Sequence, residues 1–227
     1  REVTPYVTGI SESKGGAGNP SPITAYGVYV GMKAAAKFKY GSDVLENRKV
    51  IVQGIGHVGE TLVDHLTQEG AKVIITDINQ ARLEEVSAKY GAEIYTGENI
   101  YGLNADIYAP CALGATINDA TINQLNVDII AGAANNQLAN EIVHGKILME
   151  KGIVYAPDFV INSGGIINVY AELEGYGKSE IKRKTDNIYN TTLEIISNAE
   201  ANNMTTHAAS LAIAESRIAA RKKENSK

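Results

Sequence analysis

Positions 50 to 59 read Val50-Ile51-Val52-Gln53-Gly54-Ile55-Gly56-His57-Val58-Gly59, an apolar run followed at once by a glycine-rich turn. From there on, positions 58, 62, 63 and 66 are apolar, which is the spacing of one helical face. A second apolar run, 73–76, ends on Asp77, 18 residues after the last glycine of the turn. The order of strand, glycine turn, helix, strand and carboxylate predicts a βαβ unit with a dinucleotide-binding fingerprint.

Each residue of the turn has its own expected task. Gly54 permits the tight turn, Gly56 lets the backbone approach a pyrophosphate, and Gly59 lets the helix pack closely on the strand. The helix N-terminus offers unpaired N–H groups and the positive end of the helix dipole to the phosphates. His57 and Val58 belong to this phosphate-binding turn, with the His57 side chain directed away from the pyrophosphate.

Asp77 and its neighbour Ile78 are assigned to the same cofactor site. The Asp77 carboxylate can accept hydrogen bonds from the adenosine ribose hydroxyls and would repel a 2′-phosphate, which favours NAD over NADP. Arg82, the nearest cation, is expected on the following helix and is a weak rival. The alternative to this interpretation is a glycine turn in an α/β sheet that binds no ligand.

Strands alternate with helices along most of the chain. Strands are expected at 49–53, 72–76, 93–95, 107–109, 128–131 and 153–155, with an extended segment at 158–161 before a glycine turn at 164–165. Helices are expected from Ser21, as N-cap, to about 39, and at 58–69, 80–90, 117–125 (with Asn118 as N-cap), 143–151, 166–173, 180–202 and 208–223.

This alternation predicts an α/β fold: a doubly wound parallel sheet (Rossmann) with helices on both faces and a helical C-terminal extension. We expect residues 1–21 to be a linker from a preceding domain, 22–180 the NAD-binding Rossmann domain, and 181–227 the C-terminal helices. Ligands of such a sheet bind at the carboxyl ends of the strands.

Composition and charge argue against several classes of protein. The 227 residues carry a net charge of −5, which does not fit a nucleic-acid-binding surface over the whole chain. No apolar run approaches the roughly 18 residues of a membrane span, and no signal peptide is visible. Cys111 is the only cysteine, so no internal disulfide can form and a reducing, cytoplasmic location is expected. The 4 histidines show no metal-ligand spacing, so no metal site is expected.

Two loops that follow predicted strands carry candidate ligand contacts. In the first, Cys111 and Ala112 can present backbone groups to a cofactor ribose. The Cys111 thiol is better explained as a small apolar group than as a nucleophile, because nothing nearby in the sequence activates it. In the second, 132–137, the consecutive carboxamides Asn135 and Asn136 indicate either a ligand contact or an Asn-rich turn. The position after a strand favours the ligand contact.

A third loop leads from Asn162 into a helix that carries Ile166 and Val169. These two residues lie three apart and therefore share a helical face. They either line an aliphatic pocket or belong to the core, and the spacing alone favours the core.

Four stretches of the chain are informative in combination. They are Gly18-Asn19-Pro20-Ser21-Pro22-Ile23-Thr24-Ala25-Tyr26-Gly27-Val28, Ala109-Pro110-Cys111-Ala112-Leu113-Gly114, Gly132-Ala133-Ala134-Asn135-Asn136-Gln137 and Tyr155-Ala156-Pro157-Asp158-Phe159-Val160-Ile161-Asn162. Together they resemble the glutamate/leucine/phenylalanine/valine dehydrogenase family, and within it the chain looks most like the bacterial members that act on leucine. The resemblance implies NAD-dependent oxidative deamination of a branched-chain L-amino acid to its 2-oxo acid, with release of ammonia, by an enzyme that is a homo-oligomer at full length.

The resemblance also implies roles for individual residues. Thr24, Asn135 and Asn162 match family positions near the nicotinamide end of the cofactor, and Asn136 matches a position close to the substrate. The partner implied is a small-molecule amino acid.

Three further positions of the resemblance concern small and aliphatic side chains. Ile166 and Val169 match positions that line the substrate side-chain pocket, which reverses the preference for the core. The bacterial members that act on leucine often have alanine at the third fingerprint position, where this chain has Gly59. Either residue is expected to be small enough for helix–strand packing.

No catalytic residue is assigned in this chain. The family carries two lysines, one of them in a glycine-rich motif, and an aspartate in a separate N-terminal domain. Lys14-Gly15-Gly16 is not that motif, because it belongs to the loop that leads into the helix start at Ser21. The chain is therefore expected to be the cofactor-binding part of the enzyme. Two alternatives stay open: a stand-alone NAD-binding module without catalysis, and a dehydrogenase of phenylalanine, valine or glutamate.

Overall fold

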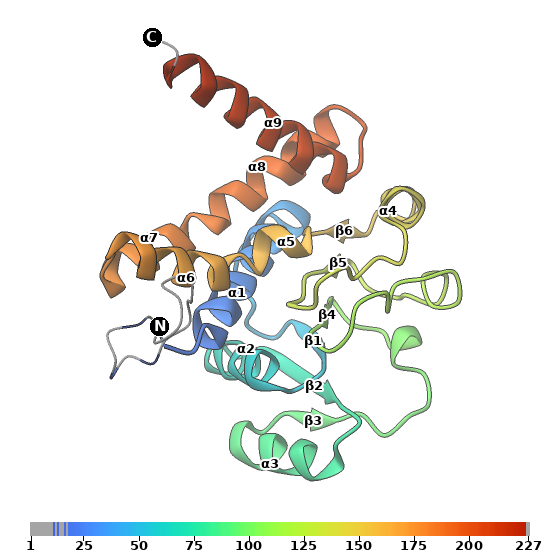
Figure 1. Ribbon diagram of the computed structural model, residues 1–227. Coiled ribbons are helices and arrows are strands. Elements are labelled where there is room, and N and C mark those ends of the chain that lie inside the picture. The colour runs from blue at the N-terminus through green and yellow to red at the C-terminus, as the bar shows by residue number, and fades with distance from the viewer. Residues whose placement is uncertain (1–10, 12, 14–15, 17, 226–227) are drawn as a thin grey trace.

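One parallel sheet forms the centre of the molecule. The computed structural model describes residues 11, 13, 16 and 18–225. In this part of the chain the sheet has the strand order β3-β2-β1-β4-β5-β6 (Figure 1). Its strands are β1 (Lys49–Gln53), β2 (Lys72–Thr76), β3 (Glu93–Ile94), β4 (Ile107–Pro110), β5 (Ile129–Ile130) and β6 (Val154–Tyr155). The order runs outward from β1 in both directions, which confirms the doubly wound parallel fold.

The side chains of the central strand β1 point alternately into two cores, one on each face of the sheet. Val50 pairs with Val73 of β2 on one side and with Ile107 of β4 on the other. Val50 and Val52 point into a core built with helices α1 (Ser21–Tyr40) and α2 (His57–Gln68). Ile51, between them, points into a second core on the opposite face. A strand buried on both faces reads as a continuous apolar run, as parallel sheets require.

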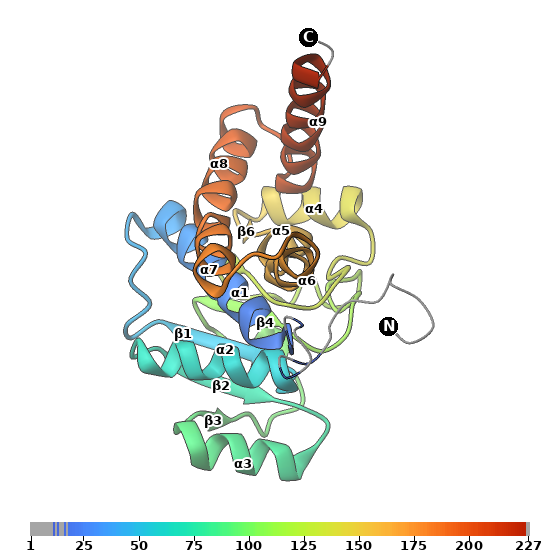
Figure 2. The same cartoon turned by 60° about the vertical axis from the view of Figure 1, so that its left-hand side comes forward.

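The helices cover the two faces unequally. They are α1, α2, α3 (Gln80–Tyr90), α4 (Glu141–Glu150), α5 (Asp158–Ile161), α6 (Gly164–Glu174), α7 (Lys178–Asp186), α8 (Ile188–Ala201) and α9 (Thr206–Asn225), together with a short 3-10 helix, Ile100–Gly102. Residues of α1, α2 and α3 share the first core, whereas the second core takes α4 and the irregular segment before β5. Both views show α9 extending away from the sheet, with the C-terminus at its far end (Figures 1 and 2).

The segment 117–125 was expected to be helical and instead forms a series of turns. The side-chain oxygen of Asn118 accepts a hydrogen bond from the N–H of Ala120 at 3.0 Å, as a cap would. The hydroxyl of Thr121, however, donates to the carbonyl of Thr116 at 2.6 Å. Such side-chain bonds to the backbone compete with helical hydrogen bonding. Ile117 and Ile122 are nevertheless buried. The apolar pattern therefore indicated correctly that these side chains are buried, but it did not indicate a helix.

The predictions for the C-terminal part also need correction. The segment 158–161 is the short helix α5 and not an extended segment, and the glycine pair at 164–165 begins α6 and is not a turn. The expected helix 180–202 is two helices, α7 and α8, with Asn187 as the C-cap of one and the N-cap of the next. No glycine or proline marks this break, and the apolar residues keep a helical spacing across it, so the sequence predicted one continuous helix.

Several helix starts differ from the expected ones by one or two residues. Helix α1 begins at Ser21 itself, with Pro20 as N-cap, and the side chain of Asn19 accepts the Ser21 N–H at 3.0 Å. Ser21 is therefore not the cap. Helix α4 begins at Glu141, because the Asn140 side-chain oxygen accepts the N–H groups of Ile142 and Val143. Helices α2, α6, α7 and α9 also begin one or two residues before their predicted starts, and each strand of the sheet overlaps its predicted range.

Some expectations concern the ends of the chain or its division. Lys14 lies outside the described residues. The division proposed at residue 180 falls inside α7, and the assignment of separate domains stays a prediction. Among the described helices, none combines the length and apolar character that crossing a bilayer requires.

Candidate functional site

The loops at the carboxyl ends of β1, β4 and β5 lie next to one another. Strand order reverses at β1, and this is where ligands of doubly wound sheets bind. The loop after β4 follows β1 closely, since the N–H of Cys111 donates to the carbonyl of Gln53 at 2.7 Å. The loop after β5 is tied to it in turn, since the N–H of Ala134 donates to the carbonyl of Pro110 at 2.9 Å.

Two glycines of the fingerprint are required by the fold itself. Gly54 has a φ of +93°, and a Cβ added to it would lie 2.6 Å from the Cβ of Ala112. A Cβ added to Gly59 would lie 2.0 Å from the carbonyl oxygen of Gly54. Such a contact cannot form without a backbone shift, so the expectation that alanine would fit at position 59 is wrong for this chain. The loop after β4 therefore packs directly on the glycine turn.

The middle glycine of the fingerprint behaves differently. Gly56 is the N-cap of α2, with φ −63° and ψ −169°, a conformation open to any residue. A Cβ added there meets no atom of the described residues within 4 Å. His57, the first residue of α2, is exposed, and Val58 packs against the core. The space beside Gly56, at a helix N-terminus, is thus open for a ligand.

Asp77 holds the glycine turn from the end of β2. One carboxylate oxygen accepts the N–H of Ile55 at 2.8 Å, and the other accepts the N–H of Asn79 at 2.9 Å. Each oxygen keeps further acceptor capacity for a ligand hydroxyl. The neighbouring Ile78 is fully exposed, so nothing in the described chain covers this aliphatic side chain.

Arg82 is engaged elsewhere. Its guanidinium pairs with Glu60 of α2 and, at 2.5 Å, with Glu85 of its own helix. The hydrogen bond that Arg82 donates to Glu85, with the charge of Glu60 beside it, raises the pKa of Arg82. A guanidinium held by two carboxylates is a poor partner for a 2′-phosphate, so Arg82 stays a weak rival to Asp77.

Cys111 has no chemical character of a nucleophile. Burial raises the pKa of its thiol to about 12, so the reactive thiolate is not populated near neutral pH. Its backbone N–H is used in the bond to Gln53. Ala112, the next residue, is exposed except where it contacts Gly54. Backbone groups of this loop remain available to a ligand from Ala112 onward.

The structure brings Asn135 and Asn162 together. The Asn162 side-chain N–H₂ donates to the carboxamide oxygen of Asn135 at 2.7 Å and to the carbonyl of Ala133 at 3.1 Å. Asn136 has a positive φ of 52°, and its carbonyl accepts the N–H of Ala115 at 2.7 Å. The side chains of Asn135 and Asn136 are exposed. The polar residues of the second and third candidate loops therefore form one surface.

Thr24 lies at the start of α1, against the start of α6. Its hydroxyl donates to the carbonyl of Pro20 at 2.9 Å, and a Cβ added to Gly165 would lie 2.7 Å from this hydroxyl oxygen. Farther along α6, the Ile166 side chain is 71% exposed and Val169 is half-buried. Ile166 is therefore not a core residue, and the interpretation from spacing alone is wrong for it.

Sequence reasoning missed two residues that organise this surface. Asp158 at the first position of α5 is only 6% exposed, and one of its carboxylate oxygens accepts the N–H of Gln137 at 3.2 Å. Gln137 is fully buried, and its side-chain N–H₂ donates to the carbonyls of Gly132 and Ala134 at 2.7 and 3.0 Å. An aspartate directly after Pro157 and a strand is a helix-start signal that could have pointed to Asp158.

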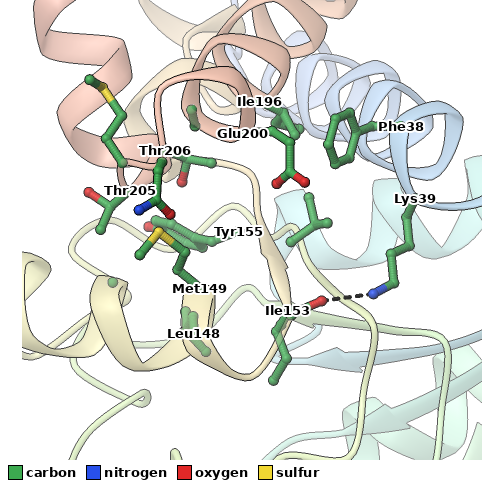
Figure 3. A pocket seen from close by; sticks show the side chains of 16 residues that line it. Phe38, Lys39, Leu148, Met149, Ile153, Tyr155, Ile196, Glu200, Thr205 and Thr206 are labelled. Carbon is green, nitrogen blue, oxygen red and sulfur yellow. Dashed lines mark hydrogen bonds between the residues drawn. The ribbon is translucent and has the colours of Figure 1, made fainter.

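A separate cavity lies at the sheet edge formed by β6. It has a volume of about 310 Å³ and lies between the end of α1, α4, α8 and the corner before α9 (Figure 3). Lys39 closes one side of it by donating to the carbonyl of Gly152 at 2.7 Å. None of the predicted site residues lines this cavity, so it is distinct from the candidate site. In the part of the chain that the structure describes, no group of histidine, cysteine, aspartate and glutamate side chains could hold a metal ion.

Almost the whole chain is similar to known amino-acid dehydrogenases. The model of the family "Glutamate/Leucine/Phenylalanine/Valine dehydrogenase" matches residues 15–79 and 75–225. Leucine dehydrogenase of Bacillus cereus is 51% identical over 225 residues, which are 99% of this chain and 61% of that protein. Phenylalanine dehydrogenase of Caldalkalibacillus thermarum is 42% identical over 228 residues, 98% of this chain and 61% of that protein.

A solved structure agrees with the sequence comparison. The crystal structure of L-tryptophan dehydrogenase from Nostoc punctiforme superposes with a TM-score of 0.87 at 45% identity, covering 90% of this chain and 61% of that one. The chain thus spans 61% of the length of these three relatives.

Proposed function

Because this chain belongs to the glutamate/leucine/phenylalanine/valine dehydrogenase family, we propose that it is the NAD-binding part of an enzyme that oxidatively deaminates an L-amino acid. The relatives matched over most of the chain are amino-acid dehydrogenases, which supports this class of enzyme. Since the chain spans 61% of their length, the activity of the whole protein is part of the proposal.

The observation that carries the proposal is the open space beside Gly56. The backbone conformation of Gly56 suits any residue, and an added Cβ would touch no atom of the described chain. The fold thus gives no reason for glycine at this position, in contrast to Gly54 and Gly59. A pyrophosphate lying against the backbone at the N-terminus of α2 does give a reason.

The other residues of the site fit the remaining parts of NAD. Asp77 would accept hydrogen bonds from the adenosine ribose, and the exposed Ile78 offers an apolar surface beside it. The loop at Cys111 and Ala112 would hold the second ribose through its backbone groups. Thr24, Asn135 and Asn162 would orient the nicotinamide end. When bound, NAD supplies the acceptor for the hydride that leaves the substrate Cα.

The substrate end of the site is aliphatic and polar. Ile166 is exposed at the start of α6, with Val169 on the same face, and both suit an apolar substrate side chain. Asn136 would lie close to the substrate. We propose a branched-chain amino acid, leucine first, because the leucine dehydrogenases share more identity with this chain than the phenylalanine enzyme does. Aromatic amino acids are the competing substrates that a test must include.

No residue of this chain is assigned as an acid, base or nucleophile. The lysines and the aspartate that the resemblance implies are expected in a part of the protein that this sequence does not contain. This chain would bind and orient NAD and shape one side of the substrate pocket. We further propose that the whole protein is a cytoplasmic homo-oligomer.

Calorimetric titration of this chain with NAD tests the proposal directly. We expect saturable binding of NAD with one molecule per chain, and much weaker binding of NADP. A chain that is folded by circular dichroism and binds neither nucleotide would refute the assignment of the cofactor. The substrate class needs the full-length protein, assayed with leucine, valine, phenylalanine and tryptophan in parallel.

A further inference from the structure

The loop 132–137 is held at two points by one short helix. Helix α5 is a single turn, with Asp158 at its first position and Asn162 as its C-cap. At its start, the Asp158 carboxylate accepts the N–H of Gln137 at 3.2 Å. At its end, the Asn162 side chain donates to Ala133 and Asn135. The loop and the helix turn therefore form one unit.

Asp158 is an unusual group for such a place. Its side chain is almost completely buried, and among the described residues no lysine, arginine or histidine pairs with it. Its second oxygen accepts the N–H of Phe159 at 2.8 Å, and the hydroxyl of the buried Tyr155 also lies against this side chain, so two backbone N–H groups and a tyrosine hydroxyl surround the carboxylate. Burying a charge is costly unless hydrogen bonds compensate it, and an apolar residue would fill the same space more cheaply. Core packing alone therefore does not explain this residue.

The consequence of the double attachment appears at Asn135. The oxygen of its carboxamide is occupied by the N–H₂ of Asn162, which fixes which side of the carboxamide faces outward. The side chain is exposed, so its N–H₂ group is presented to the surface as a donor. A donor held in one orientation binds an acceptor without a cost for ordering the side chain.

We infer that Asp158 is a positioning residue of the cofactor site: it fixes the loop 132–137 on α5 so that Asn135 presents its amide N–H₂ to the nicotinamide end of NAD. This inference rests on the proposed function, because it assumes that NAD is the ligand. It adds a residue that touches no ligand itself and acts through Asn135.

The test compares NAD with ADP-ribose, which has the same adenosine, pyrophosphate and second ribose and lacks the nicotinamide. The variant Asp158→Asn keeps the size of the side chain but turns one acceptor into a donor that faces a backbone N–H. Asp119→Asn is the matched control, because Asp119 is exposed on the surface, pairs with His144 alone among the described residues and lies outside the site. Dissociation constants of both ligands are measured by calorimetry for each form of this chain.

We expect Asp158→Asn to raise the ratio of the NAD to the ADP-ribose dissociation constant by about 2- to 12-fold, the scale of one hydrogen bond. The affinity for ADP-ribose should stay at the wild-type value, and Asp119→Asn should leave both affinities unchanged. A loss of equal size for both ligands, together with a lower melting temperature, would show a merely structural role and overturn the inference. So would an unchanged ratio, or a wild-type chain that binds both ligands equally.

A second variant asks whether Asp158 acts through Asn135. Asn135→Ala should raise the same ratio, and adding Asp158→Asn to it should raise the ratio no further, because the two changes remove one interaction. Additive effects of the two changes would contradict the route through Asn135. If the wild-type chain binds neither ligand, the proposed NAD site fails, and this outcome is distinct from an unchanged ratio with tight binding of both.

Discussion

The carboxylate of Asp77 accepts the backbone N–H of Ile55 at 2.8 Å, so the end of β2 holds the glycine turn that follows β1. The residue expected to select the cofactor thus also supports the phosphate-binding turn. A substitution at Asp77 will disturb both tasks, and the two must be separated by comparing ligands that differ only at the ribose.

Asp77→Ala should reduce the preference for NAD over NADP by about 1–3 kcal/mol, the scale of hydrogen bonds to a charged group. If the substitution also loosens the glycine turn, the binding of both nucleotides weakens to the same extent. This effect cancels in the ratio of their dissociation constants. Calorimetric titration of wild type and variant with each nucleotide gives this ratio. A variant that loses affinity for both nucleotides in equal measure would show that Asp77 only supports the turn.

Gly56→Ala should weaken NAD binding by at least about tenfold, because the added methyl group occupies the space where the pyrophosphate approaches the backbone. The midpoint of urea unfolding should stay at the wild-type value, because an added Cβ meets nothing in the described chain. Both quantities are measured on the same preparation. Unchanged NAD affinity in the folded variant would contradict the assignment of the open space beside Gly56 to a pyrophosphate.

Gly59→Ala, unlike Gly56→Ala, should lower the stability of the fold. The added Cβ would lie 2.0 Å from the carbonyl oxygen of Gly54, so helix α2 must shift away from β1. Overpacking of this kind costs about 1–3 kcal/mol of unfolding free energy. Urea unfolding of the variant measures it, with Gly56→Ala as the matched glycine-to-alanine control. Equal stability of the two variants would mean that the turn yields easily at Gly54.

The raised pKa of the half-buried Cys111 thiol predicts a loss of stability at alkaline pH. Its pKa is raised to about 12 in the folded chain, from an ordinary value of about 8.5 in the unfolded one. Above the lower value the unfolded chain releases a proton that the folded chain keeps, so stability falls as pH rises from about 8.5 towards 12. Cys111→Ala should therefore lose less unfolding free energy between pH 8 and pH 10 than wild type. Parallel curves would show that the thiol does not titrate differently in the two states.

Leucine-dependent formation of NADH by this chain alone should lie below detection. The chain has the residues expected to hold NAD, but the groups expected to activate water and hold the substrate carboxylate have no match in it. General acid–base help is worth about 10²–10⁴ in rate, and positioning adds to this. The assay follows NADH absorbance with purified chain, leucine and NAD. Clear turnover would direct attention to Lys14, which Lys14→Ala would then test.

The sequence predicts the central strands well for a physical reason. Lys49–Gln53 and Lys72–Thr76 are buried on both faces, so their apolar runs are continuous and end where burial ends. Helix α5 could not be predicted in this way, because four residues are too few to show a helical period. The break at Asn187 was missed because both helices around it keep their apolar spacing and no glycine or proline interrupts it.

The candidate site was predictable to the extent that its residues follow strands. Asn135 was selected because its loop follows a strand and Asn162 because it matches a family position, but their mutual hydrogen bond depends on a turn whose shape the sequence does not reveal. Asp158 went unrecognised as an organising residue because its partner, the N–H of Gln137, is a backbone group 21 positions away. Every residue except proline has a backbone N–H, so the type of residue at position 137 does not indicate that its N–H bonds to Asp158.

The hydrogen bond between Asp77 and Ile55 also bears on the entropy of ligand binding. The glycine turn is already held in one conformation, by this bond and by the contacts of Gly54 and Gly59 with their neighbours. The conformational entropy of these residues is lost when the chain folds, before any nucleotide arrives. A dinucleotide that meets a rigid turn spends none of its interaction energy on ordering it. The adenosine half of the proposed dinucleotide would therefore find a rigid anchoring point.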